Sequence, residues 1–161
     1  PLHVEVDGPD TAPVTVVLAH GWTLDSSTWA PVSAALSGPG ARVVRYDHRG
    51  HGRSGVADPA SLTLDQLADD LALLIARTAP TGPLVLAGHS MGGMTLMALA
   101  DRHPDVVARA AGVALVATAA GGLADTSFGL PRQTVPVVRA VEDRLFASRR
   151  WAAGSRLGSP R

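Results

Sequence analysis

Gly-His-Ser-Met-Gly-Gly, residues 88–93, places a serine between two glycines at the point where a strand pattern gives way to a helix pattern. The preceding run, residues 83–87, is short and apolar, as a buried parallel strand should be. The following run, residues 94–100, is rich in helix-forming residues. The flanking glycines relieve crowding where the backbone doubles back and leaves the serine strained and exposed. This context favours a nucleophilic role for Ser90 over the alternative of a plain glycine-rich turn.

A nucleophilic serine needs rigid N–H donors for the negative charge that develops on the substrate oxygen. One donor is expected from Met91, because N–H groups in the first turn of a helix are unpaired and the helix dipole favours an anion there. The second is expected from a loop after an earlier strand. Residues 14–19 form an apolar strand pattern, and His20-Gly21-Trp22 follows directly. We expect Gly21 to let the backbone turn and Trp22 to present its N–H to the oxyanion; the alternative is a simple turn after a strand.

Three motifs follow one another along the chain: His-Gly-Trp at 20–22, Asp-His-Arg-Gly-His-Gly-Arg-Ser at 47–54, and the serine turn at 88–93. Their order and spacing resemble the α/β-hydrolase superfamily over residues 2 to about 118. The resemblance implies a three-layer α/β-hydrolase fold with a mainly parallel sheet that is incomplete at the C-terminus. It covers only the N-terminal part of such a domain.

Within the superfamily, residues 20–25, Trp29 and Met91 are most similar to small serine esterases and cofactor-free haloperoxidase/perhydrolase enzymes. The resemblance implies that Ser90 attacks a small-molecule acyl substrate without a cofactor. It also implies that the N–H groups of Trp22 and Met91 form the oxyanion hole.

Strand and helix patterns alternate along the chain, which predicts a mainly parallel sheet covered by helices on both faces. The expected strands are residues 2–6, 14–19, 41–46, 83–87 and 111–116. A first helix is expected near residues 28–36, capped by Ser26 or Ser27. The helix after Ser90 is expected to end at residues 103–104, where a proline follows a histidine.

The clearest helix begins after Thr63, which forms a predicted capping box with Gln66. The apolar stripe of this helix recurs at helical spacing and consists of Leu64, Leu67, Leu71, Leu74 and Ile75. Two neighbouring carboxylates, Asp69 and Asp70, fall on the polar side. We expect both carboxylates to be solvated.

The loop at residues 47–54 contains two histidines, an aspartate and two glycines, a composition that suggests a metal or phosphate site. The spacing matches no zinc pattern, and the loop does not open a helix at a phosphate-binding glycine fingerprint. We therefore expect no metal site. The family resemblance implies a structural role, in which the loop holds the strand end and the serine turn near the floor of the active site.

Composition limits the possible partners. The chain has 161 residues and 46% apolar content, which is enough for one domain with a buried core. Its 14 basic and 14 acidic residues balance, which argues against nucleic acid or an anionic membrane surface as a partner. Without cysteine there is no disulfide or thiolate metal site. No run reaches the roughly 18 apolar residues of a membrane span.

Serine attack also needs a general base, nearly always a histidine oriented by a carboxylate. In the superfamily the order along the chain is serine, acid, then a histidine after the last strand. The histidines here all lie at or before position 103: His3, His20, His48, His51, His89 and His103. His89 should point away from the serine, and backbone hydrogen bonding or packing is the expected role of His20 and His48. Only His51 is a candidate for a base that could reach Ser90.

After residue 103 the sequence offers carboxylates but no base. Asp125 and Asp143 follow no recognisable late strand, so neither is assigned as the acid. The simplest interpretation is the N-terminal half to two-thirds of a serine hydrolase, with the catalytic histidine and acid missing from this chain. Residues 1–118 are the expected core, and residues 119–161 are the start of a cap or a truncated tail.

A sheet that stops early leaves a strand edge and apolar helix faces uncovered, which favours self-association through that edge. No signal peptide is visible, which favours a cytoplasmic location. Because the sequence begins with Pro1 and not with methionine, a leader that has been removed is the alternative.

Two functional hypotheses follow. In the first, the parent protein is a serine hydrolase that acts on carboxylic esters or related acyl compounds through an acyl-enzyme at Ser90. In the second, the chain is a catalytically inactive truncated scaffold, or a ligand-binding or interaction protein. A perhydrolase or an acyltransferase would use the same serine. An epoxide hydrolase or dehalogenase is disfavoured, because those enzymes need an aspartate at position 90.

Overall fold

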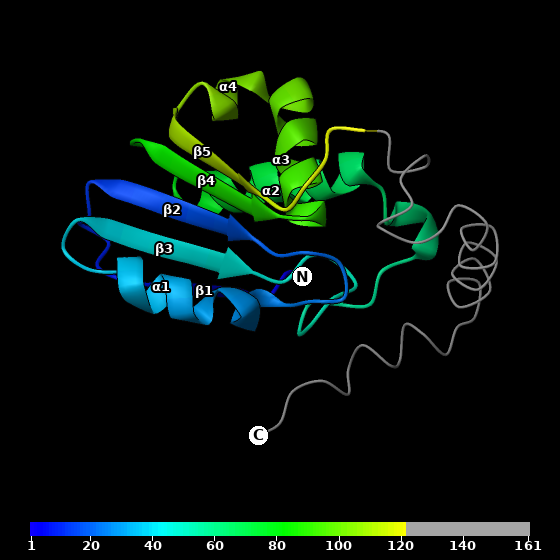
Figure 1. Cartoon of the computed structure of the whole chain (residues 1–161), viewed down its shortest axis with the longest axis horizontal. Coiled ribbons are helices and arrows are strands. Elements are labelled where there is room, and N and C mark those ends of the chain that lie inside the picture. Colours follow the sequence, from blue (N-terminus) through cyan, green and yellow to red (C-terminus); the bar gives the residue numbers. More distant parts are fainter. Residues whose placement is uncertain (122–161) are drawn as a thin grey trace. The chain divides into compact units, whose positions relative to one another are not determined.

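Five strands form one hydrogen-bonded sheet in the computed structural model, which describes residues 1–121 (Figure 1). The strands are β1 (Val4–Asp7), β2 (Val14–Ala19), β3 (Ala41–Tyr46), β4 (Leu84–His89) and β5 (Ala110–Val116). Their order across the sheet is β1-β3-β2-β4-β5. The β1 strand runs antiparallel to β3, and the other neighbouring strands are parallel. The predicted mainly parallel sheet is therefore confirmed.

Helices connect the strands and, with the sheet, make up one compact unit, Pro1–Ala120. They are α1 (Ala30–Leu36), α2 (Leu64–Thr78), α3 (Met91–Arg102) and α4 (Pro104–Val107), with short 3-10 turns η1 (Ser26–Trp29) and η2 (Pro59–Ser61). Among residues 1–121, no helix is long and apolar enough to cross a membrane. The predicted cap or tail, residues 119–161, lies almost wholly outside the described residues, as do Asp125 and Asp143.

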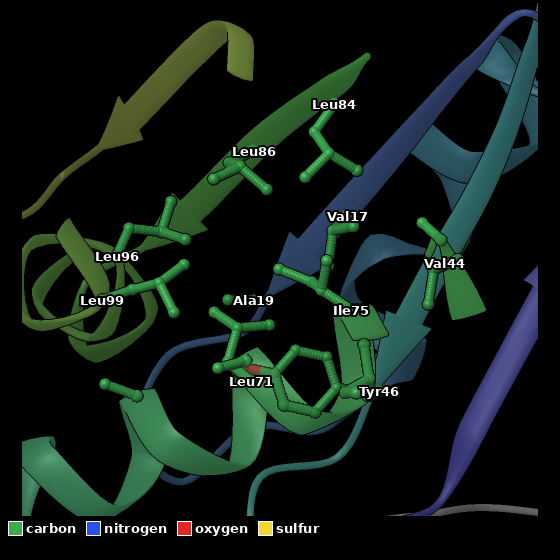
Figure 2. Close-up of a cluster of buried hydrophobic side chains, with 14 residues drawn as sticks. Val17, Ala19, Val44, Tyr46, Leu71, Ile75, Leu84, Leu86, Leu96 and Leu99 are labelled. Atoms are coloured by element: carbon green, nitrogen blue, oxygen red, sulfur yellow. The ribbon is translucent and has the colours of Figure 1, made fainter. Parts of the chain in front are cut away.

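Two apolar clusters on opposite faces of the sheet make the three predicted layers. Successive side chains of a strand point to opposite faces. Val17 and Ala19 of β2 therefore join the larger cluster, formed with α2 and α3 (Figure 2). Their neighbours Val16 and Leu18 lie in a smaller cluster on the other face, against Trp29 of η1. Figure 1 shows α1 on one side of the sheet and α2 and α3 on the other.

The α2 helix supplies most of the contact with the larger cluster. Thr63 caps it as predicted, because its hydroxyl oxygen accepts the Gln66 N–H at 3.2 Å. Four members of the predicted apolar stripe are buried: Leu67, Leu71, Leu74 and Ile75. The fifth, Leu64, is 40% exposed. It is the first helical residue, so the buried stripe begins a turn later than predicted.

The cap of the first helical segment differs from the prediction. Asp25 is the N-cap of η1, and its carboxylate accepts the Ser27 N–H at 2.9 Å. Ser26 and Ser27 lie inside the turn, so the predicted serine cap is wrong. The regular helix α1 then begins at Ala30 and continues through a proline in its first turn, where no backbone donor is needed.

Both carboxylates of the acidic pair on α2 are held in ion pairs, whereas the sequence predicted only solvated side chains; Asp69 remains about a third exposed. Arg49 donates from Nε and Nη2 to the two carboxylate oxygens of Asp70, each at 2.5 Å. Asp69 accepts from Arg102 at 2.8 and 2.9 Å and lies 2.8 Å from Nε2 of His103. These partners come from a loop and from the C-terminal end of α3, far along the chain, so helical periodicity alone could not reveal them.

The β5 strand has β4 as its one partner among the described residues, and its apolar side chains are exposed. Val113 is 51% exposed and Leu115 is 50% exposed. Parallel strands are usually covered on both faces. Within residues 1–121 the sheet therefore ends at an open edge, as the sequence predicted.

Two leucines of α2 test the layer arrangement. Leu71 is fully buried and Leu73 is 61% exposed. Leu71→Ala should lower the free energy of unfolding by about 3 kcal/mol, because it opens a cavity between α2 and the sheet. Leu73→Ala, the matched control on the same helix, should change it by less than about 0.5 kcal/mol. Urea unfolding followed by circular dichroism measures both, and equal losses would contradict the arrangement.

Candidate active site

Ser90 occupies the turn between β4 and α3 in a strained backbone conformation. Its φ is 51° and its ψ is −116°. Positive φ in a residue with a side chain costs on the order of 1–3 kcal/mol and persists only where the surroundings enforce it. The residue is half-buried. The predicted strand-to-helix turn is present, with β4 ending at His89 and α3 beginning at Met91.

The two glycines that flank the serine allow backbone to touch backbone. A Cβ on Gly88 would lie 2.5 Å from the carbonyl carbon of Gly92. A Cβ on Gly92 would overlap the Ala19 carbonyl and lie 2.8 Å from the His20 oxygen. The first turn of α3 therefore packs directly on the ends of β4 and β2, with no room for a side chain between them.

The last residue of β5 and the residues just after it also hold Ser90. The Ser90 N–H donates to the Val116 carbonyl at 2.9 Å. The Thr118 hydroxyl donates to the Ser90 carbonyl at 2.7 Å. Ala117, between these two residues, has a φ of 45°. Sequence reasoning missed Thr118, because a single threonine after a strand forms no motif.

The His-Gly-Trp loop lies against the serine turn, as its predicted role requires. A Cβ on Gly21 would lie 2.6 Å from Nδ1 of His89 and 3.3 Å from Cβ of Ser90. Trp22, the next residue, is 42% exposed. The structure thus brings the loop that carries Trp22 beside the residue pair Ser90 and Met91.

His20 orients the peptide that joins Gly21 to Trp22. Its Nε2 accepts the His48 N–H at 2.9 Å, so the ring proton is assigned to Nδ1, which donates to the Gly21 carbonyl at 2.7 Å. The Leu24 N–H donates to the same carbonyl at 3.2 Å. In a trans peptide the N–H points opposite to the C=O. The Trp22 N–H therefore points away from His20 and Leu24.

Burial lowers the pKa of His20 to about 4, although its bond to the Gly21 carbonyl acts in the opposite direction. His20 is fully buried, and the ring of His48 lies 4.5 Å away, centroid to centroid. His48 donates from Nε2 to the His20 carbonyl at 3.1 Å. Burial lowers the pKa of His48 as well. Both rings are therefore neutral at pH 7.

Asp47 ties the glycine-rich loop to the chain before α1. Its carboxylate accepts the Ser26 N–H and the Arg53 N–H, each at 2.7 Å. Burial raises the pKa of Asp47, but the hydrogen bonds from Arg53 and Ser26 outweigh burial, and the net pKa is lowered. These bonds support the part of the prediction in which the loop holds the strand ends, since the His48 N–H also binds His20, which follows β2. That the loop holds the serine turn stays a prediction. Residues 1–121 contain no group of three or more metal-ligating side chains placed to hold an ion.

No histidine ring nitrogen bonds to the Ser90 hydroxyl among the described residues. His51, the candidate base, instead donates from Nδ1 to the Arg49 carbonyl at 3.0 Å, with its ring 5.4 Å from that of His20. His103 contacts Asp69. The structure therefore brings together Ser90, Met91 and the Trp22 loop, but it provides no hydrogen-bonded base within residues 1–121.

The strand order, the helical layers and the strained serine turn define this chain as an α/β-hydrolase. More narrowly, it belongs to the family described as serine aminopeptidase, S33, whose model matches residues 11–156.

Known relatives agree with this class. The chain is 38% identical to a monoacylglycerol lipase from Mycolicibacterium smegmatis over 100 residues, which cover 60% of this chain and 36% of that protein. It is 34% identical to a bifunctional esterase/perhydrolase from Acinetobacter calcoaceticus over 143 residues, 88% of this chain and 50% of that protein. The structure of a thermophilic esterase from Thermogutta terrifontis superposes with a TM-score of 0.68 at 33% identity, covering 89% of this chain and 47% of that chain. The chain spans half or less of these proteins.

The buried His20 predicts how stability depends on pH. Its pKa is about 4 in the folded protein and 6.5 when unfolded, so the unfolded state binds the proton first as the pH falls. The stabilising effect of neutral His20 is full above pH 6.5 and is lost between pH 6.5 and pH 4.

His20→Asn should therefore abolish about 2 kcal/mol of the stability loss between pH 7 and pH 5. Urea unfolding at several pH values measures this loss. The ¹⁵N chemical shifts of the native protein should show His20 as the Nδ1–H tautomer. An unchanged pH dependence in His20→Asn would contradict the assignment.

Proposed function

We propose that the complete protein is a serine hydrolase that acts on carboxylic esters or related small acyl compounds through an acyl-enzyme at Ser90. The observation that carries this proposal is the backbone of Ser90, held at a φ of 51° on the turn between a buried strand and a helix. Strain of this kind is typical of functional sites. It places Ser90 at the carboxyl end of the interior strand β4, beside the His-Gly-Trp loop.

In the proposed reaction, the Ser90 oxygen attacks the acyl carbon while a base takes its proton. The carbonyl oxygen of the substrate becomes an oxyanion, which accepts hydrogen bonds from the N–H groups of Met91 and Trp22. The alcohol leaves with a proton, and water then hydrolyses the acyl-enzyme. Support for Met91 comes from its place at the start of α3, where first-turn N–H groups have no acceptor inside the helix. Support for Trp22 comes from the orientation that His20 imposes on its peptide.

The general base and the acid are proposed to lie outside residues 1–161. The sequence has no histidine after His103, and no described histidine bonds to the Ser90 hydroxyl. These observations also favour the second candidate, namely that residues 1–161 alone are an inactive scaffold. The two candidates are compatible, since one concerns the complete protein and the other this chain by itself.

The relatives do not separate an esterase from a perhydrolase, because one relative is named as both. An acyltransferase would use the same serine as well. The boundary at residue 118, self-association through the β5 edge, the absence of nucleic-acid partners and a cytoplasmic location all stay predictions. The zero net charge argues against a polyanion such as nucleic acid as a partner.

Ser90→Ala tests the proposed function directly. In the complete protein, we expect it to lower kcat for p-nitrophenyl butyrate by at least about 10⁴-fold, because the acyl-enzyme cannot form. Ser61→Ala, a serine that bonds only within its own surface turn, is the matched control and should keep native activity.

Undiminished turnover by Ser90→Ala would contradict the serine mechanism. Residues 1–161 expressed alone should show negligible turnover. Strong, Ser90-dependent turnover by that segment would instead place the base within it, with His51 the first residue to replace.

A further inference from the structure

The Ser90 carbonyl and the Met91 N–H belong to the same peptide unit. All peptides of the described residues are trans, so this N–H points opposite to the carbonyl. Whatever holds the Ser90 carbonyl therefore sets the direction of the N–H at the other end of the unit. In the proposed function, that N–H is an oxyanion donor, and small errors in its direction would weaken the hydrogen bond.

The Ser90 carbonyl accepts hydrogen bonds from two sources. The Gly93 N–H and the Met94 N–H, in the first turns of α3, donate to it at 2.9 and 3.2 Å. The hydroxyl of Thr118 donates at 2.7 Å, from a segment 28 residues further along the chain. Thr118 is therefore the one described side chain that holds this carbonyl.

The backbone around Thr118 is shaped to make this contact. Val116 accepts the Ser90 N–H at 2.9 Å, so one short segment binds both polar backbone groups of the serine. Ala117, between the two contacts, also has a positive φ, 45°. Gly93 leaves the space that Thr118 fills, since a Cβ there would lie 2.6 Å from Cγ2 of Thr118.

We propose that Thr118 is a positioning residue for the reaction: its hydroxyl anchors the Ser90 carbonyl and thereby aims the Met91 N–H at the oxyanion. This inference rests on the proposed function. A donor aimed before the reaction needs no reorganisation when charge develops, which is the main source of oxyanion stabilisation. A hydrogen bond to the carbonyl also polarises the N–H of the same amide and strengthens it as a donor.

Thr118→Val and Thr118→Ser separate the hydroxyl from the shape of the side chain. The valine variant keeps the volume and removes the donor, while the serine variant keeps the donor. Thr95→Val is the matched control, because the Thr95 hydroxyl donates at 2.9 Å to the Met91 carbonyl, one peptide further into α3. That peptide carries the Gly92 N–H, which has no proposed part in the reaction.

The kinetic constants are measured on the complete protein with p-nitrophenyl butyrate. Inhibition by phenylboronic acid is measured as well, because its tetrahedral adduct with the serine would place an oxygen in the oxyanion hole. Thr118→Val should lower kcat by about 10-fold and leave KM within about twofold of the native value. The loss is smaller than for removal of an oxyanion donor, because the Met91 N–H is still present but less well directed. The inhibition constant of the boronic acid should rise by a similar factor. Thr118→Ser should stay within about threefold of native kcat, and Thr95→Val within about twofold.

A native kcat in Thr118→Val would overturn the inference, and so would equal losses in Thr118→Val and Thr118→Ser. An equal kcat loss in Thr95→Val would assign the effect to general destabilisation of α3 and would also overturn it. Thermal unfolding of each variant verifies that it is folded at the assay temperature. Ser90→Ala separates failure of the proposed function from failure of this inference. Activity that survives Ser90→Ala overturns the proposed function itself. Activity that is lost in Ser90→Ala but native in Thr118→Val overturns only the role of Thr118.

Discussion

The close approach of backbone to backbone around Ser90 is the constraint on which the rest of this structure depends. The first turn of α3 contacts the ends of β2 and β4 at positions where only glycine fits, Gly88 and Gly92. That contact forces the chain to leave β4 and enter the helix in a single residue. The backbone changes direction at Ser90 alone, which therefore has a positive φ that few residues with a side chain adopt. The residue in this position is held rigidly by the sheet itself.

Hydrogen bonds from outside the turn then fix the peptides around the serine. The Gly21 carbonyl is held by His20, and the Ser90 carbonyl by Thr118. In both peptides a side chain binds the carbonyl end, and the N–H end faces away from it. Asp47 does not contact these peptides. Its carboxylate ties the loop at residues 47–54 to the chain before α1. Neutral imidazole and ionised carboxylate are the forms that make these bonds, and burial and backbone donors set their pKa values accordingly.

Local sequence patterns predicted much of the fold, because a run of a few neighbouring residues is enough to indicate a strand or a helix. Residues 14–19 and 41–46 are strands with the predicted bounds, because each is a run rich in branched side chains bounded by turn residues. The β4 strand runs two residues past the prediction, through Gly88 and His89. Glycine there is typical of a turn, yet both residues pair with neighbouring strands. Periodicity cannot detect a pairing that depends on another part of the sheet. The candidate site divides in the same way: Ser90, Met91 and Trp22 lie in short motifs that local pattern can locate, whereas Thr118 acts on a partner 28 residues away that no local spacing encodes.

The most direct test of the central claim is covalent labelling of Ser90. The complete protein would be incubated with a fluorophosphonate, which reacts with an activated serine to form a stable phosphonate ester, and then digested for mass spectrometry. We expect one phosphonylated site, on the peptide that contains Ser90, with labelling that proceeds at the same rate as the loss of esterase activity. An enzyme that hydrolyses esters while Ser90 stays unlabelled, or that is inactivated by labelling at another residue, would contradict it.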